Sequence, residues 1–307
     1  MESLLEALKK GQPVNKKGYF NLYTDNIFGR EMNPLFQKMF IEGSGDELGI
    51  KARAVHSSSM LSYNFFHWID ENHPFFWDKI DESHPSSRER IEYNQVLFEV
   101  KMKTIKGSPA PANMDVVLIG KDKNHILFIE SKFTEYTNAR KFELSKSYKD
   151  LEKWYYKEAK WTDIVNYTPE EKAKYKEGIK QLITHLFGIH SLFAEDSKAR
   201  CEALKDIDID PAKIEFLSLI FEPDTKDFEK EHEDFDNYKQ LVENFRKEIS
   251  NKGLKITPKL VSYSELWNDL ITQKLPTGLK EFLWERYMQF AQEAKDTIKL
   301  YKTKERQ

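Results

Sequence analysis

Two carboxylates and a lysine stand at strand ends in this chain, where they could bind a cation and act on a substrate anion. Asp115 lies near the start of the apolar segment 113–119, and Glu130 and Lys132 end the apolar segment 126–132. Apolar runs of this length, separated by six polar residues, predict two buried strands joined by a turn. Because side chains alternate along a strand, Glu130 and Lys132 share one face of it.

The register of this hairpin decides whether the two acids meet. If Ile119 pairs with Ile126, then Asp115 lies directly opposite Glu130, and directly opposed residues have Cβ atoms roughly 4.5–5.5 Å apart. Opposed carboxylates repel each other, which raises the pKa of one of them unless a cation lies between. A hard divalent ion with oxygen ligands is the natural occupant, and Lys132 would then face a substrate anion or an attacking water. The alternative is that both acids are ordinary strand-end residues and that Lys132 bridges one of them.

A Glu-x-Lys triplet is weak evidence by itself. Similar acid-x-Lys triplets occur in charged helical or loop-like sequence at 158–160, 170–172, 224–226 and 293–295. The triplet at 130–132 differs from these because it ends an apolar strand and has an acid at the matching position of the preceding strand. This context gives the motif its weight.

Asp115 followed by Glu130-Ser131-Lys132 resembles the active-site motif of the PD-(D/E)xK nuclease superfamily, the restriction-endonuclease-like fold. Within that superfamily, the chain is similar to a branch of uncharacterised bacterial restriction endonucleases. The resemblance extends from about residue 56 to about residue 222. Three segments carry the likeness to the branch: 98–101, 130–135 and 178–185.

The resemblance implies a role for each residue of the motif. Asp115 and Glu130 would bind the metal ion, with the backbone carbonyl of Ser131 as a further ligand, and Lys132 would orient or activate water. The proline that names the superfamily is absent, since Met114 precedes the first acid.

Two other polar side chains are candidates for the same site. Glu99 is the acid inside the predicted strand 96–102, and an acid in an apolar strand is rarely buried without a partner. It is either a third carboxylate near the metal or an edge charge paired with a neighbouring lysine. On the predicted helix 175–193, Gln181 and His185 lie four residues apart and share a face. The resemblance favours Gln181 as a hydrogen-bond partner of a metal-bound water or ligand, whereas His185 is interpreted as a polar edge residue.

The elements around these residues predict an α/β fold. Both faces of the hairpin are apolar, so both need cover, and we expect a restriction-endonuclease-like core with a mixed central sheet flanked by helices and a helical C-terminal extension. We treat 1–307 as a single domain with a nuclease-like core at 56–222 and a mainly helical extension at 223–307. Further predicted strands are 213–221 and 260–263; further predicted helices are 1–10, 57–69 (where Asn64 is interpreted as an ordinary helix residue), 138–161, 235–250, 264–273 and 278–300. Residues 70–90 are predicted as loop.

Composition sets outer limits on function. The 307 residues are 39% hydrophobic and 32% charged, which is typical of a soluble globular protein, and no apolar run reaches the ~18–20 residues of a membrane span. Cys201 is the single cysteine, which excludes a disulfide framework and a cysteine zinc site and favours a reducing cytoplasm. The net charge of −3 is not that of a general nucleic-acid binder, although local patches steer binding more than the total charge does.

Together these observations predict a nuclease that depends on Mg²⁺, with Mn²⁺ as a substitute. Its substrate would be DNA, its action that of an endonuclease in restriction or repair, and the resemblance adds a homodimer as an expectation. A catalytically silent module of the same fold, which binds nucleic acid or a partner protein, is the competing hypothesis, and the net acidity favours it. A third hypothesis is a structural protein whose hairpin charges form an ion-pair network. The intact set of two acids and a lysine favours the enzyme.

Overall fold

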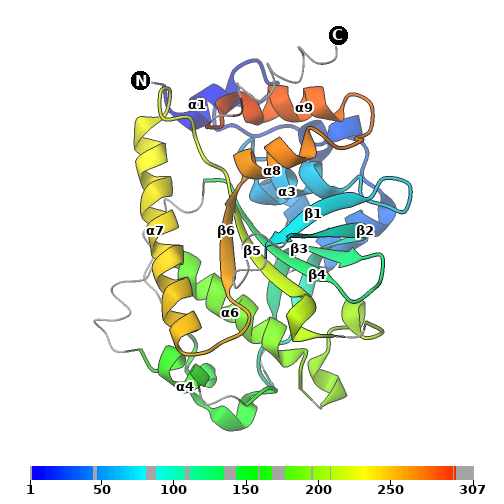
Figure 1. The fold of residues 1–307 in the computed structure, drawn as a ribbon. Helices are drawn as coiled ribbons and strands as arrows, with labels where there is room; N and C mark the ends of the chain where they lie inside the picture. Colours follow the sequence, from blue (N-terminus) through cyan, green and yellow to red (C-terminus); the bar gives the residue numbers. More distant parts are fainter. Residues whose placement is uncertain are drawn as a thin grey trace.

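A six-stranded mixed sheet forms the centre of the molecule (Figure 1). The computed structural model describes residues 2–43, 47–80, 88–107, 111–134, 143–157, 160–167, 177–194, 196–207, 209–292 and 294. The strands follow one another in the order β1 (Phe75–Ile80), β2 (Arg88–Met102), β3 (Ala112–Gly120), β4 (Ile126–Lys132), β5 (Ile214–Ile220) and β6 (Pro258–Ser262). Strands β1 to β4 are antiparallel neighbours, whereas β4, β5 and β6 run parallel. The predicted α/β class with a mixed central sheet is confirmed.

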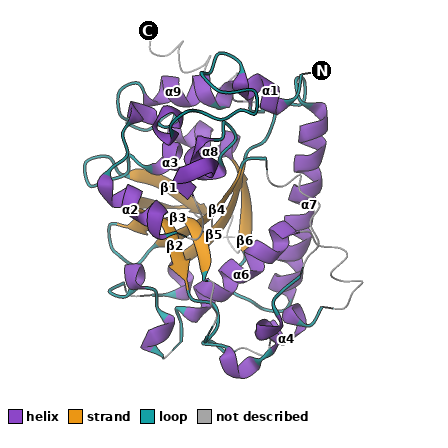
Figure 2. Ribbon diagram, turned by 180° about the vertical axis from the view of Figure 1, so that it is seen from behind, coloured by secondary structure: helices purple, strands orange, loops and turns teal. Residues whose placement is uncertain are grey.

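Helices cover both faces of this sheet, as Figures 1 and 2 show from opposite sides. The helices are α1 (Leu4–Lys9), α2 (Pro34–Glu42), α3 (Ser58–Phe66), α4 (Lys160–Val165), α6 (Glu177–Ser191), α7 (Glu229–Asn251), α8 (Tyr263–Leu270) and α9 (Leu279–Arg286). Shorter helical turns are η1 (Tyr23–Asn26), η2 (Phe28–Arg30), η3 (Glu47–Lys51), η5 (Lys146–Lys149), η6 (Leu151–Lys153), η7 (Ser197–Ala199), η8 (Glu202–Leu204), η9 (Pro211–Lys213) and η10 (Met288–Phe290). In the part of the chain described, no helix is long and apolar enough to cross a membrane.

The alternation of side chains along the strands divides the core in two. Val116 and Leu118 of β3 pack in one cluster with apolar side chains of α1, α2, α3, α8 and α9. Val117 and Ile119 pack in a second cluster with side chains of α4, α6 and α7. Strands that are apolar on both faces are buried from both sides, as the sequence predicted. Glu130 and Lys132 alternate with Ile129 and therefore face the α6 side of the sheet.

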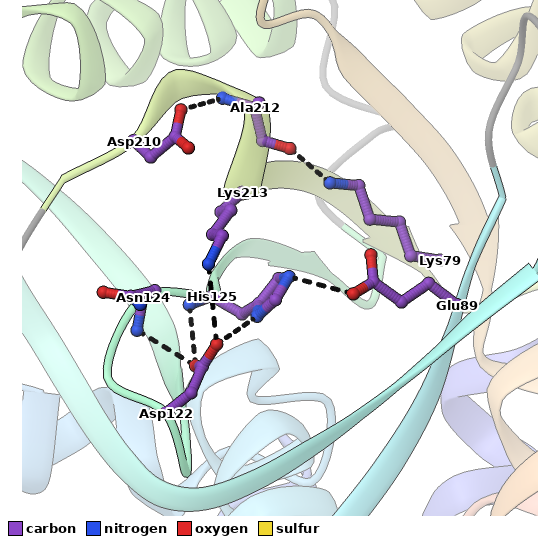
Figure 3. Close-up of polar contacts among 8 residues, drawn as sticks. All are labelled: Lys79, Glu89, Asp122, Asn124, His125, Asp210, Ala212 and Lys213. Atoms are coloured by element: carbon purple, nitrogen blue, oxygen red, sulfur yellow. Dashed lines mark hydrogen bonds and ion pairs between the residues drawn. The ribbon is translucent and has the colours of Figure 1, made fainter.

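The β3–β4 hairpin has the predicted register, since Ile119 pairs with Ile126. Its turn is held by polar contacts that Figure 3 shows. The carboxylate of Asp122 accepts hydrogen bonds from the backbone N–H groups of Asn124 at 3.0 Å and His125 at 3.2 Å, and it lies 2.9 Å from the His125 ring. An Asp that binds the backbone two and three residues on stabilises a tight turn, and this local geometry sets the register of every later pair.

The same turn is tied to neighbouring segments (Figure 3). His125 Nε2 lies 3.6 Å from a Glu89 carboxylate oxygen of β2, and Lys213 Nζ lies 3.8 Å from Asp122. Lys79 of β1 donates to the Ala212 carbonyl just before β5. These contacts connect the hairpin turn to the beginnings of β2 and β5, and thus support the end of the sheet that is remote from the two acids.

Helix ends are specified by short polar side chains. Ser57 Oγ accepts the Met60 N–H at 3.3 Å, so α3 begins where the sequence predicted it. At α8, Ser262 and Glu265 cap each other's backbone N–H groups in a capping box. The predicted strand 213–221 is confirmed as β5, and the strand 260–263 is confirmed as β6 with earlier bounds. Residues beyond 222 therefore add a strand to the sheet as well as helices.

Three predicted segments are wrong. Residues 70–90 were predicted as loop, yet Phe75–Ile80 forms β1. Pairing with β2 stabilises this strand, whereas the polar residues around it in the sequence indicate a loop. The predicted helix 138–161 is broken within residues 143–157 into η5 and η6, while its described end, residues 160–161, begins α4. Ser145 and Asp150 there bind the backbone two residues on, which competes with helix formation.

The predicted helix 278–300 ends early. Helix α9 stops at Arg286, Tyr287 has non-helical dihedral angles of φ −134° and ψ −56°, and η10 follows it. Tyr287 is fully buried, so its packing overrides the helical pattern of the sequence. Residues 293 and 295–300 of this prediction lie outside the described part of the chain.

Candidate active site

Three neighbouring strands bring three acids to one place. In the pairing of β2 with β3, Phe98 pairs with Val116 and Val100 pairs with Met114, and Glu99 and Asp115 lie between these two pairs. The pairing of β3 with β4 ends at Val116 and Ile129, and Asp115 and Glu130 are the next residues beyond that pair. The two acids of the motif form a side-chain hydrogen bond, and Glu99 of β2 lies on the β2 side of Asp115.

The motif residues contact one another closely. Asp115 Oδ2 accepts the backbone N–H of Ser131 at 2.7 Å. Lys132 Nζ lies 2.5 Å from Glu130 Oε1, and both side chains are buried. The Ser131 hydroxyl points to the opposite face, where it lies 2.8 Å from the Tyr263 hydroxyl of α8. The lysine thus bridges one of the two acids, while the alternation of side chains is as the sequence predicted.

Burial and nearby charges give the carboxyl groups of Asp115 and Glu130 different pKa values. The pKa of Asp115 is raised well above its ordinary value, first by burial and then by the charges of Glu130 and Glu99. Burial acts in the same direction on Glu130, but the charge of Lys132, followed by His185 and the hydrogen bonds of Lys132 and Asp115, lowers the pKa of Glu130. The proton of the pair is therefore held on Asp115, and the negative charge is held on Glu130.

Glu99 is the third acid of the cluster, and its backbone is strained. Its φ of +50° is in the left-handed region, which costs about 1–3 kcal/mol for a residue with a side chain and persists only where the surroundings enforce it. Burial, together with the charges of Glu47 and Glu130, raises the pKa of Glu99 to about 8. Asn113 Nδ2 donates to its carboxyl at 3.3 Å. The position of Glu99 fits the prediction of a third carboxylate better than that of an edge charge.

A fourth acid, Glu47 of η3, was missed by the sequence analysis. It is buried, it accepts a hydrogen bond from the Ser59 hydroxyl of α3 at 3.0 Å, and Lys51 Nζ lies 2.5 Å from its other oxygen. It also repels the charge of Glu99. The one sequence signal was the Glu–Lys spacing of four residues, which is common in exposed helices and gave no reason to place Glu47 beside the sheet.

Helix α6 places its two polar candidates in different surroundings. Gln181 is exposed to solvent. His185, interpreted as a polar edge residue, is buried instead, and its Nδ1 lies 3.3 Å from Glu130 Oε2. Burial lowers the pKa of His185 although Glu130 opposes this, so the ring is neutral at pH 7. His185 is thus the residue of α6 that lies beside the acids, because the apolar stripe of the helix turns this part of its surface to the sheet.

Asn64 is a structural residue of α3, in agreement with its interpretation as an ordinary helix residue. Its side chain accepts the Phe28 N–H at 2.9 Å and donates to the Asn26 carbonyl at 3.0 Å and the Tyr287 hydroxyl at 2.8 Å. It is fully buried and joins the N-terminal segment to the end of α9.

The chemistry of the acid cluster fits a hard divalent cation. Glu99, Asp115 and Glu130 offer oxygen ligands only. The Ser131 N–H points toward Asp115 and the Lys132 carbonyl accepts the Phe221 N–H of β5 at 2.9 Å, so alternation along the strand turns the Ser131 carbonyl toward Asp115 as well.

The cluster is closed by its own hydrogen bonds. Lys132 occupies one oxygen of Glu130, and the Ser131 N–H occupies one oxygen of Asp115. Consistent with this, no group of three or more His, Cys, Asp or Glu side chains among the described residues is already arranged to hold a metal ion. A cation at these two oxygens would compete with Lys132 for Glu130 and with the Ser131 N–H for Asp115.

Comparison with known proteins identifies the family. A family model described as Restriction Endonuclease associating with ARP matches residues 3–288, which includes the segments before and after the resemblance seen at 56–222. No curated protein and no solved structure matches the chain. Because the family model covers nearly the whole sequence, and because β2, β3 and β4 unite the acids and the lysine of a nuclease motif, the chain belongs to this restriction-endonuclease family.

Proposed function

We propose that this protein is a nuclease that hydrolyses phosphodiester bonds of DNA with the help of Mg²⁺, for which Mn²⁺ can substitute. The observation that carries the proposal is the meeting of Asp115 and Glu130 across the β3–β4 hairpin with Lys132 at 2.5 Å from Glu130. Membership of a restriction-endonuclease family supports it. The action would be that of an endonuclease in restriction or repair.

Each residue of the cluster has a distinct task in this proposal. Asp115, Glu130 and the Ser131 carbonyl would hold the cation, with Glu99 as a further oxygen donor. A divalent ion so held supplies polarisation of a phosphate oxygen and a lower pKa for a water molecule. His185 would orient Glu130 from the side of α6, because its ring contacts the oxygen that Lys132 does not.

Lys132 would have two roles, one without a bound cation and one with it. In the metal-free arrangement it neutralises Glu130, whose buried charge would otherwise be costly. With a cation held by the acids, Lys132 would face the attacking water or the developing charge on the phosphate, where a compact cation on a flexible stem is effective.

The proposal is tested by cleavage of supercoiled plasmid, linear duplex and single strands with Mg²⁺, Mn²⁺ or EDTA. Asp115→Asn and Lys132→Ala should abolish cleavage in every metal while the far-UV circular dichroism stays that of the wild type. A matched control is Lys259→Ala: Lys259 Nζ lies 2.9 Å from the buried Glu215 carboxylate of β5, on the opposite face of the same sheet. Full metal-dependent cleavage by Asp115→Asn or Lys132→Ala would refute the proposal.

One observation favours a second candidate, a silent module that binds DNA or a partner protein. Glu130 is buried and paired with Lys132, with the neutral His185 ring 3.3 Å from its other oxygen, as in a site that has become structural. Calorimetry with Mg²⁺ and Mn²⁺ separates the candidates. A nuclease should bind the metal ion and lose that affinity in Asp115→Asn, whereas a silent module should not bind it. The description of the family names ARP, which makes ARP a candidate partner, and a homodimer is a further proposal.

A further inference from the structure

A second lysine stands at the acid cluster, outside the motif. Lys51 ends η3, and its Nζ lies 2.5 Å from Glu47 Oε1. The side chain of Glu47 is only 9% exposed, whereas that of Lys51 is 60% exposed. Glu47 is itself fixed from behind by the Ser59 hydroxyl of α3 at 3.0 Å. The exposed Lys51 ammonium is therefore paired with the buried Glu47 carboxylate, which is itself held in place.

The charge of Lys51 extends to the motif. Besides Glu47, it interacts with Glu99 and Asp115, and these attractions raise the pKa of Lys51, mainly through the hydrogen bond to Glu47. Lys132 is the buried cation of the cluster, with a side chain 7% exposed. The site therefore has one ammonium inside and one at its rim.

The rim position follows from the local packing. Gly43, which follows α2, lies so close to Glu99 that a Cβ atom there would be 3.3 Å from the Glu99 carboxylate. Helix α2 packs on β2, and η3 packs on α2, so the chain between α2 and α3 brings Glu47 and Lys51 over the same end of the strands. Lys51 is therefore an exposed ammonium at the end of the strands that carries the acids.

We propose that Lys51 binds a phosphate of the DNA backbone beside the candidate active site and that Glu47 is its positioning residue. The inference rests on the proposed function for its substrate class. A polyanion is attracted by a cation and repelled by ionised acids such as Glu130, so an exposed cation at the edge of the cluster favours passage of the backbone there. Lys51 suits that task because its ammonium is already hydrated and exposed, and because Glu47 limits the freedom that its long stem would lose on binding.

The test is binding of a short fluorescent DNA duplex in EDTA, followed by anisotropy over a series of salt concentrations. EDTA prevents turnover, so the readout is independent of cleavage. Lys51→Ala should bind several-fold more weakly, and the slope of log K against log salt should become shallower by about 0.9, the value for one lost phosphate contact on duplex DNA. Lys51→Arg should restore both the affinity and the slope. Glu47→Gln, which keeps the acceptor for Ser59, should weaken binding less than Lys51→Ala does.

Lys205→Ala is the matched control. Lys205 Nζ also lies 2.5 Å from a carboxylate, that of Glu202, and its side chain is 54% exposed. The Glu202 side chain is 85% exposed, however. The acids that act on the charge of Lys205 are Glu202 and Asp206, and neither belongs to the acid cluster. Lys205→Ala should bind duplex DNA like the wild type.

The proposal is overturned if Lys51→Ala keeps the affinity and salt slope of the wild type, if Lys205→Ala loses as much as Lys51→Ala, or if the wild type does not bind the duplex. Its failure is distinct from that of the proposed function. Loss of cleavage in Asp115→Asn with unchanged binding in Lys51→Ala would retain the nuclease and remove the phosphate contact. Binding that depends on Lys51 in a protein that never cleaves would support the contact and refute the nuclease.

Discussion

Replacing Glu99 with glutamine should reduce the pH dependence of stability in the metal-free protein. Glu99 is buried in β2 beside Asp115, and burial together with Glu47 raises its pKa from 4.5 to about 8. The folded protein therefore keeps a proton that the unfolded chain releases in this range. Stability from this group is fully present below pH 4.5 and is lost as the pH rises toward 8.

The size of the effect follows from the same values. The pKa rises from 4.5 to about 8, and one pKa unit corresponds to about 1.4 kcal/mol, so the loss approaches about 5 kcal/mol as an upper limit. Because Glu99 shares its electrostatic environment with Asp115 and Glu130, part of this total is distributed among the three acids. The amide of Glu99→Gln imitates the protonated acid and does not titrate.

Urea unfolding in EDTA, monitored by tryptophan fluorescence across this pH range, measures the prediction. Wild type and Glu99→Gln should be similarly stable in acid, and the variant should be the more stable protein above pH 8 by several kcal/mol. Glu92→Gln is the control in the same strand, since Glu92 is partly exposed and pairs with Lys121 at 3.0 Å. Parallel stability curves for wild type and Glu99→Gln would refute the placement of a buried, protonated acid at this position.

Three further substitutions test the scaffold around the site by urea unfolding. Asn64→Ala leaves the Tyr287 hydroxyl and two backbone groups without their partner and should cost about 2–4 kcal/mol, and a loss below about 1 kcal/mol would contradict the bonding described. Gly188→Ala places a Cβ atom 2.5 Å from Met102 Cβ, where α6 packs on β2, and should cost about 1–3 kcal/mol; a neutral effect would show that the helix can move away. Asp122→Ala removes the acceptor of the hairpin turn and should cost about 1 kcal/mol with unchanged cleavage, and an altered cleavage rate would show that the turn influences the acids.

The hairpin and its two opposed acids could be predicted from the sequence because they depend on local rules. Ile119 pairs with Ile126 across a six-residue connection, and alternation with a period of two then assigns every later side chain to a face. The approach of Asp115 to Glu130 follows from that register, and alternation puts Lys132 on the same face as Glu130. The contact of Lys132 with Glu130 was only the alternative interpretation of the sequence. The helix N-terminus at Ser57 was predictable for the same reason, since its signal lies within four residues.

The remainder of the cluster was decided by contacts between distant segments. Glu47 reaches the site through packing of η3 on α2 and α3, and nothing near it in the sequence indicates a strand or a ligand. Whether His185 or Gln181 lies beside the acids depends on which part of α6 faces the sheet. The spacing of residues along one helix does not determine this.

Strand β1 likewise forms because β2 offers it a partner, and Tyr287 ends α9 early because its ring is buried in the core. In each of these cases the free energy comes from burial and pairing with residues far away in the chain, which local propensity does not contain. The sequence by itself therefore determined the chemistry of the hairpin, while the tertiary structure decided which other charges surround it.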